Sequence, residues 1–261
     1  MSESSGPDWN FRSTVRTNKR RTKVICTIGP ATTSFPALKQ LYEAGMNVVR
    51  VNMSHADHKT AARIIGWIKT LNRQVEYAVP ILLDTQGPEI RTGVLEHPMS
   101  LTEGEIVRLT VRDPHTVETK SIHVNYDEIV EVVDVGRIVT LDNGLFNFEV
   151  LEKSANHLTC RVLDGGVLGS RKHVNLPGVR VNLPAITEKD RQDIAFGIEN
   201  DVDFIALSFV RRPEDVQELR DFLGSKQNTI KIISKIEDQE GVTNIHEIVK
   251  LSDGVMVARG D

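Results

Sequence analysis

The first residues that suggest chemistry are Lys235 and Glu237, which lie at the end of a run of β-branched residues that begins at position 229. In an extended chain, residues i and i+2 point to the same side, so both side chains are predicted to project from the end of one strand. Parallel α/β proteins build their active sites at that edge of the sheet. A solvent-exposed ion pair at a strand end is the alternative interpretation, and this segment alone favours neither.

Polar residues follow the other predicted strands in the same way. In chain order they are Arg50, Asn52, Ser54 and His55; then Asp84, Thr85, Glu89 and Arg91; then Ser208 and Arg211; and finally Arg259 and Asp261. Taken singly, each is more typical of a solvated charge or a helix cap than of a site. Because the ends of successive parallel strands lie side by side, the five edges together favour one site where these residues converge.

The cations in this set suit phosphate, and two of the carboxylates suit a divalent metal. Arg50 and Arg91 offer planar forks and Lys235 a compact charge, and both geometries neutralise phosphoryl oxygens. Glu237 and Asp261 are hard oxygen ligands of the type that Mg²⁺ takes. A metal ion beside converging cations is what phosphoryl transfer requires, because its catalysis is mostly positioning and charge stabilisation.

Four further residues suit a monovalent cation, because they supply amide, hydroxyl, carboxylate and carbonyl oxygens at low total charge. They are Asn52, Ser54, Asp84 and Thr85. Roles in turns and caps explain them equally well from spacing alone. The sequence has no P-loop or dinucleotide fingerprint, and no histidine stands beside a nucleophile signature. A single histidine such as His55 is more often a hydrogen-bonded structural group than a base.

The elements that position these residues alternate between strands and helices. Residues 1–18 form a polar arm, followed by a buried strand at 22–30, a helix between Ser34 and Gly45, a strand at 46–52, a helix at 57–77 and a strand at 79–84. The strands are nearly continuous apolar runs rather than alternating ones. This pattern predicts a parallel sheet that is covered on both faces.

A different pattern occupies residues 88–183, where short alternating segments are separated by Gly, Asp and Asn turns. It predicts an all-β domain of antiparallel strands, with a hairpin turn at 142–144. The α/β pattern resumes with an imperfect capping box at Thr187 and Asp190, strands at 202–210, 229–236 and 252–260, and helices that begin near Pro213 and Gly241. An insertion between the third and fourth strands commonly serves as a lid over the strand ends.

These patterns divide the chain into an arm at 1–18, a first α/β part at 19–87, the lid at 88–183 and a second α/β part at 184–261.

Composition excludes several classes of protein. The 261 residues carry a formal net charge of −4, which provides no basic field for nucleic acid. No apolar stretch approaches the ~20 residues of a membrane span, and the polar start is unlike a signal peptide, so we expect a cytoplasmic protein. Cys26 and Cys160 match no metal spacing and are expected to stay reduced.

At these same residues the sequence resembles the pyruvate kinase family. The resembling blocks, in that family's order, are KVICTIGPAT, MNVVRVNMSH, LLDTQGPEIRTG, GSRKHVNLPG, IKIISKIE and DGVMVARGD. The resemblance implies a (β/α)₈ barrel with an inserted β-barrel lid. It also implies the glycolytic transfer of phosphate from phosphoenolpyruvate to ADP, which yields pyruvate and ATP.

The resemblance also assigns roles residue by residue. Lys235 matches the lysine that stabilises the migrating phosphoryl group, and Arg50 the arginine that binds substrate phosphate. The remaining matches are Gly260 with Asp261 for substrate; Glu237 and Asp261 for Mg²⁺ or Mn²⁺; Asn52, Ser54, Asp84 and Thr85 for K⁺; and His55, Arg91 and Lys172 for the nucleotide. Glu89 matches the glutamate of potassium-dependent members, which implies potassium dependence. Gln86 and Arg171 depart from lysines that some members carry at positions near ADP.

The length implies an incomplete barrel. Outside the predicted lid, roughly 165 residues remain, enough for five to six βα units at roughly 30 residues each. We therefore expect a barrel that is truncated after about six strands, with bare edges that favour instability or association. A later threonine of the family and its C-terminal domain are missing, and the complete enzyme is expected to be a homo-oligomer, a tetramer.

Two alternatives to an active pyruvate kinase remain. The first is a truncated, non-catalytic product that binds at most Mg²⁺ or partner chains. The second is another magnesium-dependent barrel enzyme that handles pyruvate enolate, such as a lyase or a phosphomutase. The inserted β segment and the Arg91 region argue against the second, because both suit a nucleotide under a lid.

Overall fold

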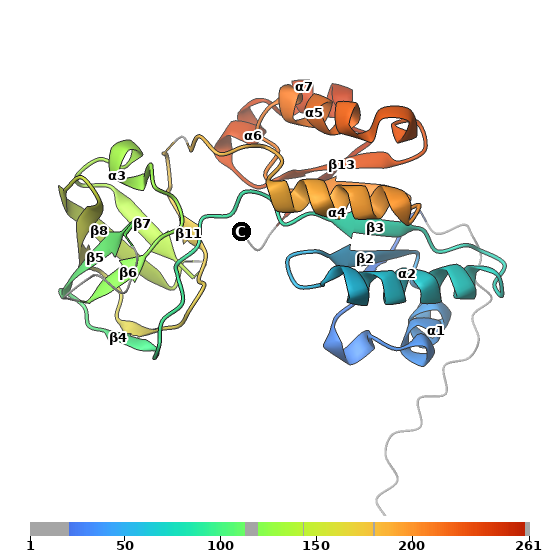
Figure 1. Ribbon diagram of the computed structural model, residues 1–261, viewed down its shortest axis with the longest axis horizontal. Coiled ribbons are helices and arrows are strands. Elements are labelled where there is room, and N and C mark those ends of the chain that lie inside the picture. Colours follow the sequence, from blue (N-terminus) through green and yellow to red (C-terminus); the bar gives the residue numbers. More distant parts are fainter. Residues whose placement is uncertain (1–20, 113–119, 143, 180, 259–261) are drawn as a thin grey trace, which may run out of the picture.

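A computed structural model describes residues 21–112, 120–142, 144–179 and 181–258, and these form an α/β part beside an all-β part (Figure 1). The predicted arm and the predicted site residues Gly260 and Asp261 lie outside the described residues. Each part has its own hydrophobic core. The division into a parallel α/β fold and a β-rich insertion is therefore confirmed, whereas the exact boundaries of the parts stay predictions.

The α/β part is built on a six-stranded sheet in which every neighbouring pair is parallel. In spatial order its strands are β1 (Ile25–Thr27), β2 (Val48–Asn52), β3 (Ile81–Asp84), β12 (Phe204–Leu207), β13 (Lys231–Ile236) and β14 (Gly254–Val257). Strands β3 and β12 are direct neighbours although the whole insertion separates them in sequence. The insertion therefore leaves the strand order of the sheet unchanged.

The two edges of this sheet differ from its centre in burial. The predicted first strand was expected to be buried, but β1 is an edge strand and Ile25 is 48% exposed. At the opposite edge, Val257 of β14 is 78% exposed. Strands β2, β3 and β12 each have neighbours on both sides, and this is where the apolar side chains are buried. Within the described residues, β1 and β14 are therefore the two edge strands of this sheet.

Helices flank the sheet and supply the other half of its core (Figure 1). They are α1 (Phe35–Ala44), α2 (His58–Asn72), α4 (Glu188–Glu199), α5 (Pro213–Leu223), α6 (Gln239–Thr243) and α7 (Ile245–Leu251). Ser34 and Gly45 cap α1 as predicted, but α2 ends five residues before the predicted boundary at 77. The capping box of α4 is complete rather than imperfect, because the shorter Asp190 side chain still reaches the Thr187 N–H. The helix expected near Gly241 begins at Gln239 and is split into two at Asn244.

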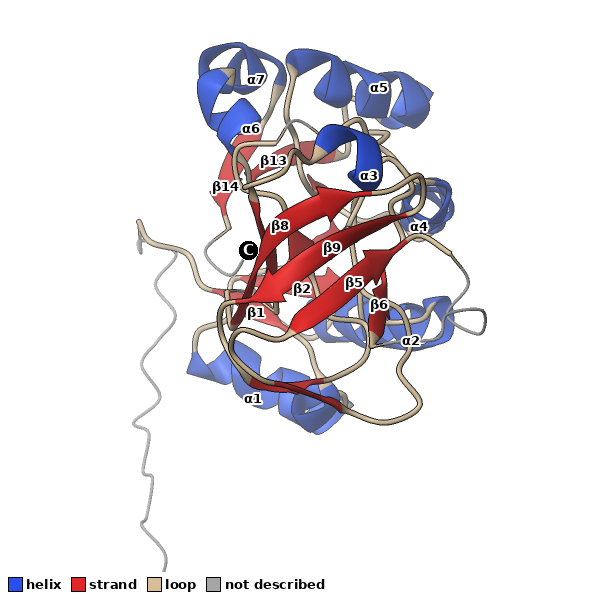
Figure 2. Ribbon diagram, turned by 90° about the vertical axis from the view of Figure 1, so that its left-hand side faces the viewer, coloured by secondary structure: helices blue, strands red, loops and turns tan. Residues whose placement is uncertain are grey.

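The all-β part contains a six-stranded sheet in the order β11-β7-β8-β9-β5-β6 and a two-stranded β10-β4 ladder. Figure 2 shows β8, β9, β5 and β6 side by side in the larger sheet. Its elements are β4 (Met99–Leu101), β5 (Ile106–Thr110), β6 (Ser121–His123), α3 (Ile129–Val132), β7 (Ile138–Leu141), β8 (Phe146–Lys153), β9 (His157–Val162), β10 (Gly166–Leu168) and β11 (Val174–Asn175). Strands β7 and β8 form the predicted hairpin, of which Asn143 lies outside the described residues. One expectation is wrong: β5 and β6 pair in parallel. The missed elements β4, β10, β11 and α3 have two to four residues each, which is too short for a periodicity to show.

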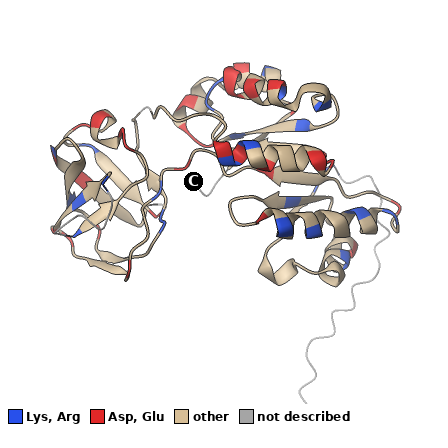
Figure 3. Ribbon diagram, viewed as in Figure 1, with Lys and Arg blue, Asp and Glu red and all other residues tan. Residues whose placement is uncertain are grey.

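Charged side chains are segregated among the outer helices (Figure 3). Helix α2 carries lysine and arginine but no acidic residue, whereas α5 carries four acidic residues and one arginine. Within the described residues, no helix combines the length and the apolar character that crossing a bilayer demands.

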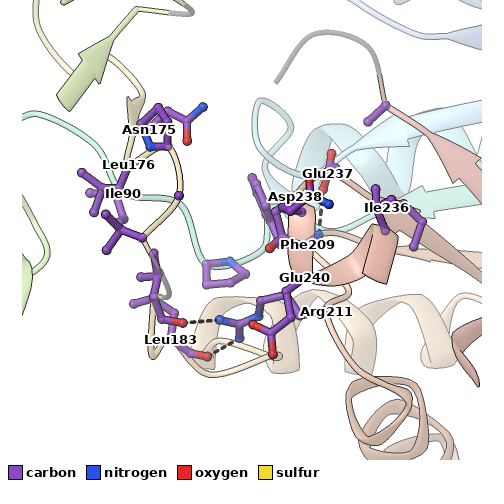
Figure 4. A pocket seen from close by; sticks show the side chains of 18 of the residues that line it. Ile90, Asn175, Leu176, Leu183, Phe209, Arg211, Ile236, Glu237, Asp238 and Glu240 are labelled. Carbon is purple, nitrogen blue, oxygen red and sulfur yellow. Dashed lines mark hydrogen bonds between the residues drawn. The ribbon is translucent and has the colours of Figure 1, made fainter. Parts of the chain in front are cut away.

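A buried arginine connects the α/β part to the segment that returns from the insertion. Arg211 donates from Nη1 to the Val181 carbonyl at 2.8 Å and from Nη2 to the Leu183 carbonyl (Figure 4). Between these two carbonyls, the Asn182 N–H donates to the hydroxyl of Tyr126 in the insertion at 3.3 Å. Successive peptide groups of this linker are therefore held alternately by the two parts.

Replacing this arginine should loosen the linker. In Arg211→Met, both donors to the linker are lost, and hydrogen bonds to charged groups each contribute about 1.5–3 kcal/mol. We expect amide hydrogen exchange at 181–183 to become at least about tenfold faster, measured by mass spectrometry. Arg220→Met is the matched control, because Arg220 also donates to a backbone carbonyl, that of Leu251, but away from the linker. Equal exchange rates in wild type and Arg211→Met would contradict the role of Arg211 in holding the linker.

The N-cap of α2 gives a pH-dependent prediction. Asp57 accepts the Thr60 N–H at 2.7 Å, and this backbone hydrogen bond is the main reason that the pKa of Asp57 lies below its ordinary 3.8. Because the folded-state pKa is lowered, its stabilisation is present above pH 3.8 and is lost as the pH falls through the lower folded value.

Asp57→Asn keeps the cap acceptor but removes the charge. We expect this variant to melt below wild type at pH 7 and the difference to close on acidification. Thermal unfolding across pH 2–7 checks this, and a difference that stays constant down to pH 2 would contradict it.

Candidate functional site

Lys235 and Glu237 lie together at the end of β13, as the sequence pattern predicts. The Lys235 Nζ atom is 3.0 Å from Glu237 Oε1, and it donates to Ser208 Oγ at 2.7 Å. Their side chains are only 10% and 1% exposed. A solvated surface ion pair is therefore excluded, because both charges have been removed from water and each depends on the other for compensation.

A second carboxylate completes the compensation of Lys235. Asp84 at the end of β3 has no exposed surface, and its Oδ1 lies 3.3 Å from Lys235 Nζ. Its Oδ2 accepts from Arg50 Nε at 2.5 Å, and Arg50 in turn donates to Thr27 Oγ1 at 3.0 Å. One buried carboxylate thus stands between two cations that come from strands on either side of it. Residues of β1, β2, β3 and β13 meet here because parallel strands end at one edge.

The turn after β12 holds the second carboxylate oxygen of Glu237, the one that does not face Lys235. The Phe209 N–H donates to Glu237 Oε2 at 2.7 Å (Figure 4), and Phe209 adopts φ of 53°, a left-handed conformation that is rare for a bulky residue. Ser208 donates to the Thr85 carbonyl at 2.7 Å and joins this turn to β3. The sequence prediction missed Phe209, since neither its backbone conformation nor its contact has a signal in residue type.

A glycine makes the close approach of these turns feasible. Gly87 has φ of 75°, and a Cβ atom there would lie 2.7 Å from Ser208 Cβ and 2.9 Å from the Phe209 ring. No other residue fits at this position without moving the turn that carries Phe209.

The residues that the sequence suggests for a monovalent cation lie at or just after the ends of β2 and β3, which are neighbouring strands. Asn52 pairs with Asp84 in the parallel register, and Asn52 Oδ1 accepts the Ser54 N–H at 3.0 Å. Thr85 follows Asp84 directly and is buried. Amide, hydroxyl and carbonyl oxygens with a single carboxylate fit a cation of low charge. Within the described residues, no three His, Cys, Asp or Glu side chains gather in a group that could hold a metal ion. His55, next to Ser54, is exposed.

The predicted nucleotide residues on the insertion lie close to one another. Arg91 forms an isolated bridge with His173, the neighbour of Lys172, and donates to the Arg171 carbonyl at 3.0 Å. Arg91 Nε also donates to Glu89 Oε2 at 2.5 Å, and Lys172 Nζ lies 2.7 Å from Asp142 Oδ2. The structure therefore brings Arg91 and Lys172 together at the base of the insertion.

A cavity of about 890 Å³ lies between the insertion and the sheet (Figure 4). Ile90 and Leu176 line it from the insertion, and Phe209, Arg211 and Glu237 line it from the α/β part. Asp238 also faces it, and burial raises the pKa of this carboxyl group above its ordinary value. Glu237 is therefore placed between the Lys235 cluster and a cavity that is large enough for a small ligand.

A family model described as pyruvate kinase, barrel domain, matches residues 19–261. The chain belongs to the pyruvate kinase family. It is 49% identical over 93% of its length to the pyruvate kinase of Geobacillus stearothermophilus, and 45% identical over 93% to that of Staphylococcus aureus strain MRSA252. It is 43% identical over 99% of its length to the chloroplastic pyruvate kinase isozyme G of Nicotiana tabacum.

The chain spans 42–46% of the length of these three pyruvate kinases. The barrel domain of the family model agrees with the parallel sheet described above, in which six strands alternate with helices. The expected fold class, a barrel truncated after about six strands with a β-rich insertion, is confirmed.

The buried carboxylate of Asp84 should be essential for stability. Asp84→Asn would leave Arg50 and Lys235 facing each other across a neutral side chain, and breaking a buried ion pair costs about 3–5 kcal/mol. We expect a loss of about 3 kcal/mol in the free energy of unfolding by urea. The control is Asp201→Asn, because Asp201 pairs with Lys226 but is 66% exposed, and its loss should cost less than about 0.5 kcal/mol. Equal losses in the two variants would contradict this view of Asp84.

Proposed function

We propose that this chain carries the phosphoryl-transfer site of a pyruvate kinase, which converts phosphoenolpyruvate and ADP into pyruvate and ATP with Mg²⁺ and K⁺. The observation that carries the proposal is the buried Lys235 ammonium, which reaches Asp84, Glu237 and Ser208 at the ends of three neighbouring strands. A site for an anionic substrate needs a cation that is fixed in place before the substrate arrives, and the two buried carboxylates fix Lys235 in this way.

Lys235 and Arg50 are proposed to bind the phosphoryl group that moves. Negative charge spreads over its oxygens during transfer, and fixed cations in a site with little water stabilise that charge more than mobile ones do. Asp84 and Glu237 hold Lys235 in position, while Asp84 and Thr27 hold Arg50. The pair is thereby preorganised from two strands on either side of β3.

Glu237, with Asp261, would hold Mg²⁺ or Mn²⁺, and Gly260 would lie beside the substrate. The metal would supply Lewis-acid stabilisation of the negative charge that develops on the phosphoryl group. The buried Glu237 carboxylate at the cavity wall is a hard oxygen donor that fits this role. Asn52, Ser54, Asp84 and Thr85 would hold K⁺, and their mostly neutral oxygens fit it. Glu89 supports potassium dependence through its match to potassium-dependent members of the family.

The nucleotide would lie under the insertion. Arg91, Lys172 and His55 are the proposed contacts to ADP or ATP, and the close placement of Arg91 and Lys172 supports a polyanionic ligand there. Family membership argues against the alternative of a lyase or phosphomutase. We further propose that the complete enzyme is a cytoplasmic homo-oligomer, a tetramer, although one relative is named as chloroplastic.

Binding and turnover of the purified chain test the proposal. We expect calorimetry with Mg²⁺ and K⁺ present to detect phosphoenolpyruvate, and a lactate-dehydrogenase-coupled assay to detect pyruvate. Lys235→Ala should weaken binding at least about tenfold and lower turnover about 10²–10³-fold, with Mg²⁺ binding largely retained. Lys231→Ala is the matched control, because Lys231 lies on the same strand, pairs with Asp253 and is 48% exposed.

The outcomes separate the remaining readings. Binding without turnover would favour a non-catalytic portion of a pyruvate kinase. Neither binding nor turnover in wild type would overturn the proposal, and equal behaviour of Lys235→Ala and Lys231→Ala would overturn the role of Lys235.

A further inference from the structure

Lys189 in the first turn of α4 reaches out of its helix to the loop that follows β2. Its Nζ atom donates to the backbone carbonyl of Met53 at 2.9 Å and to Asp193 Oδ2 at 2.6 Å. The contact to Met53 spans 136 residues of sequence. A lysine that is roughly half exposed is thus tied to a backbone atom of a distant loop.

Met53 is the residue between Asn52 and Ser54, two of the proposed potassium ligands. Its N–H donates to the carbonyl of Asp84, a third proposed ligand, at 2.9 Å, and its side chain is buried. The N–H belongs to the peptide group that follows Asn52, and the carbonyl belongs to the peptide group that precedes Ser54. Holding both atoms fixes the two peptide planes that orient these ligands.

Asp193 orients Lys189 from inside α4. This carboxylate is buried, and its second oxygen lies 2.7 Å from Nε2 of His58, whose ring stacks on Phe196 at 4.5 Å. Because Asp193 is fixed from the α2 side, it holds the ammonium of Lys189 toward Met53. Ordering a long lysine side chain costs up to about 2 kcal/mol of conformational entropy. Because the contact with Asp193 already orders Lys189, little further entropy is lost when Lys189 binds the Met53 carbonyl.

The stability of α4 does not explain this lysine. A cation in the first turn opposes the helix dipole, and a lysine four residues before an acid is the less favourable order of an i,i+4 pair. The contact that distinguishes Lys189 is therefore the one outside its own helix.

We propose that Lys189 is a positioning residue that shapes the monovalent-cation loop at 52–54 through the Met53 carbonyl. This rests on the proposed function, since the cation site is part of it. Lys189 does not touch the cation. It sets the angle between the Asn52 and Ser54 oxygens, as outer partners of metal ligands do, and their loss typically weakens metal affinity 10–100-fold.

Thallous ion, a spectroscopic substitute for K⁺, tests the inference without relying on turnover. The chain would be titrated with Tl⁺ and followed by ²⁰⁵Tl NMR, with tetramethylammonium keeping the ionic strength constant. We expect Lys189→Met to raise the dissociation constant at least about tenfold, and Asp193→Asn to raise it by a smaller factor. Thermal unfolding without Tl⁺ verifies that each variant is folded.

Lys153→Met is the matched control. Lys153 also donates to a backbone carbonyl, that of Glu131, and lies near an aspartate, Asp134, but it belongs to the insertion. Its dissociation constant should stay within about twofold of wild type.

Each result decides one point. A folded Lys189→Met variant that binds Tl⁺ as wild type does would overturn the positioning role and leave the proposed function intact. A wild-type chain that binds no Tl⁺ would overturn the potassium site, and the role of Lys189 with it. If Lys153→Met weakened Tl⁺ binding as much as Lys189→Met does, the effect would not be specific to Lys189, and the positioning role would be overturned.

Discussion

The interaction on which the site depends is the burial of the Asp84 carboxylate between Arg50 and Lys235. A carboxylate without exposed surface is stable as an anion only when cations and hydrogen bonds replace its water. Asp84 obtains this replacement from strands on both sides of β3. The constraint is mutual, because Lys235 is itself buried and needs Asp84 and Glu237. Strand order, register and charge are therefore coupled at this one edge of the sheet.

The insertion bounds the same edge without taking part in the sheet. Strands β3 and β12 pair directly, so the chain leaves and returns at adjacent points. Arg211 and Tyr126 hold the returning linker from opposite sides. The cavity between the two parts thereby has one wall that carries Glu237 and one that comes largely from apolar residues of the insertion. A ligand there would meet charge from the sheet side and apolar surface from the other.

Around the central carboxylate, backbone contacts set the positions of the polar side chains. Gly87 admits the turn that carries Phe209, and the Phe209 N–H holds Glu237. Lys189 lies on a helix that follows the insertion in the sequence, and it reaches the loop beside Asn52, which precedes the insertion. Close packing around these groups leaves few alternative positions for them, which is the condition for a preorganised site.

The alternation of strands and helices, the β-rich insertion, and the convergence of Arg50, Asp84, Lys235 and Glu237 at one edge could all be predicted from the sequence alone. These follow from local periodicity and from the rule that parallel strands end together. Only in the folded structure is it seen that Asp84 lies between two cations, that the Phe209 N–H joins the site, and that Lys189 reaches Met53. Those contacts depend on register and on helix placement, and both arise from packing between segments far apart in sequence, so no local pattern encodes them. The parallel pairing of β5 with β6 has the same origin.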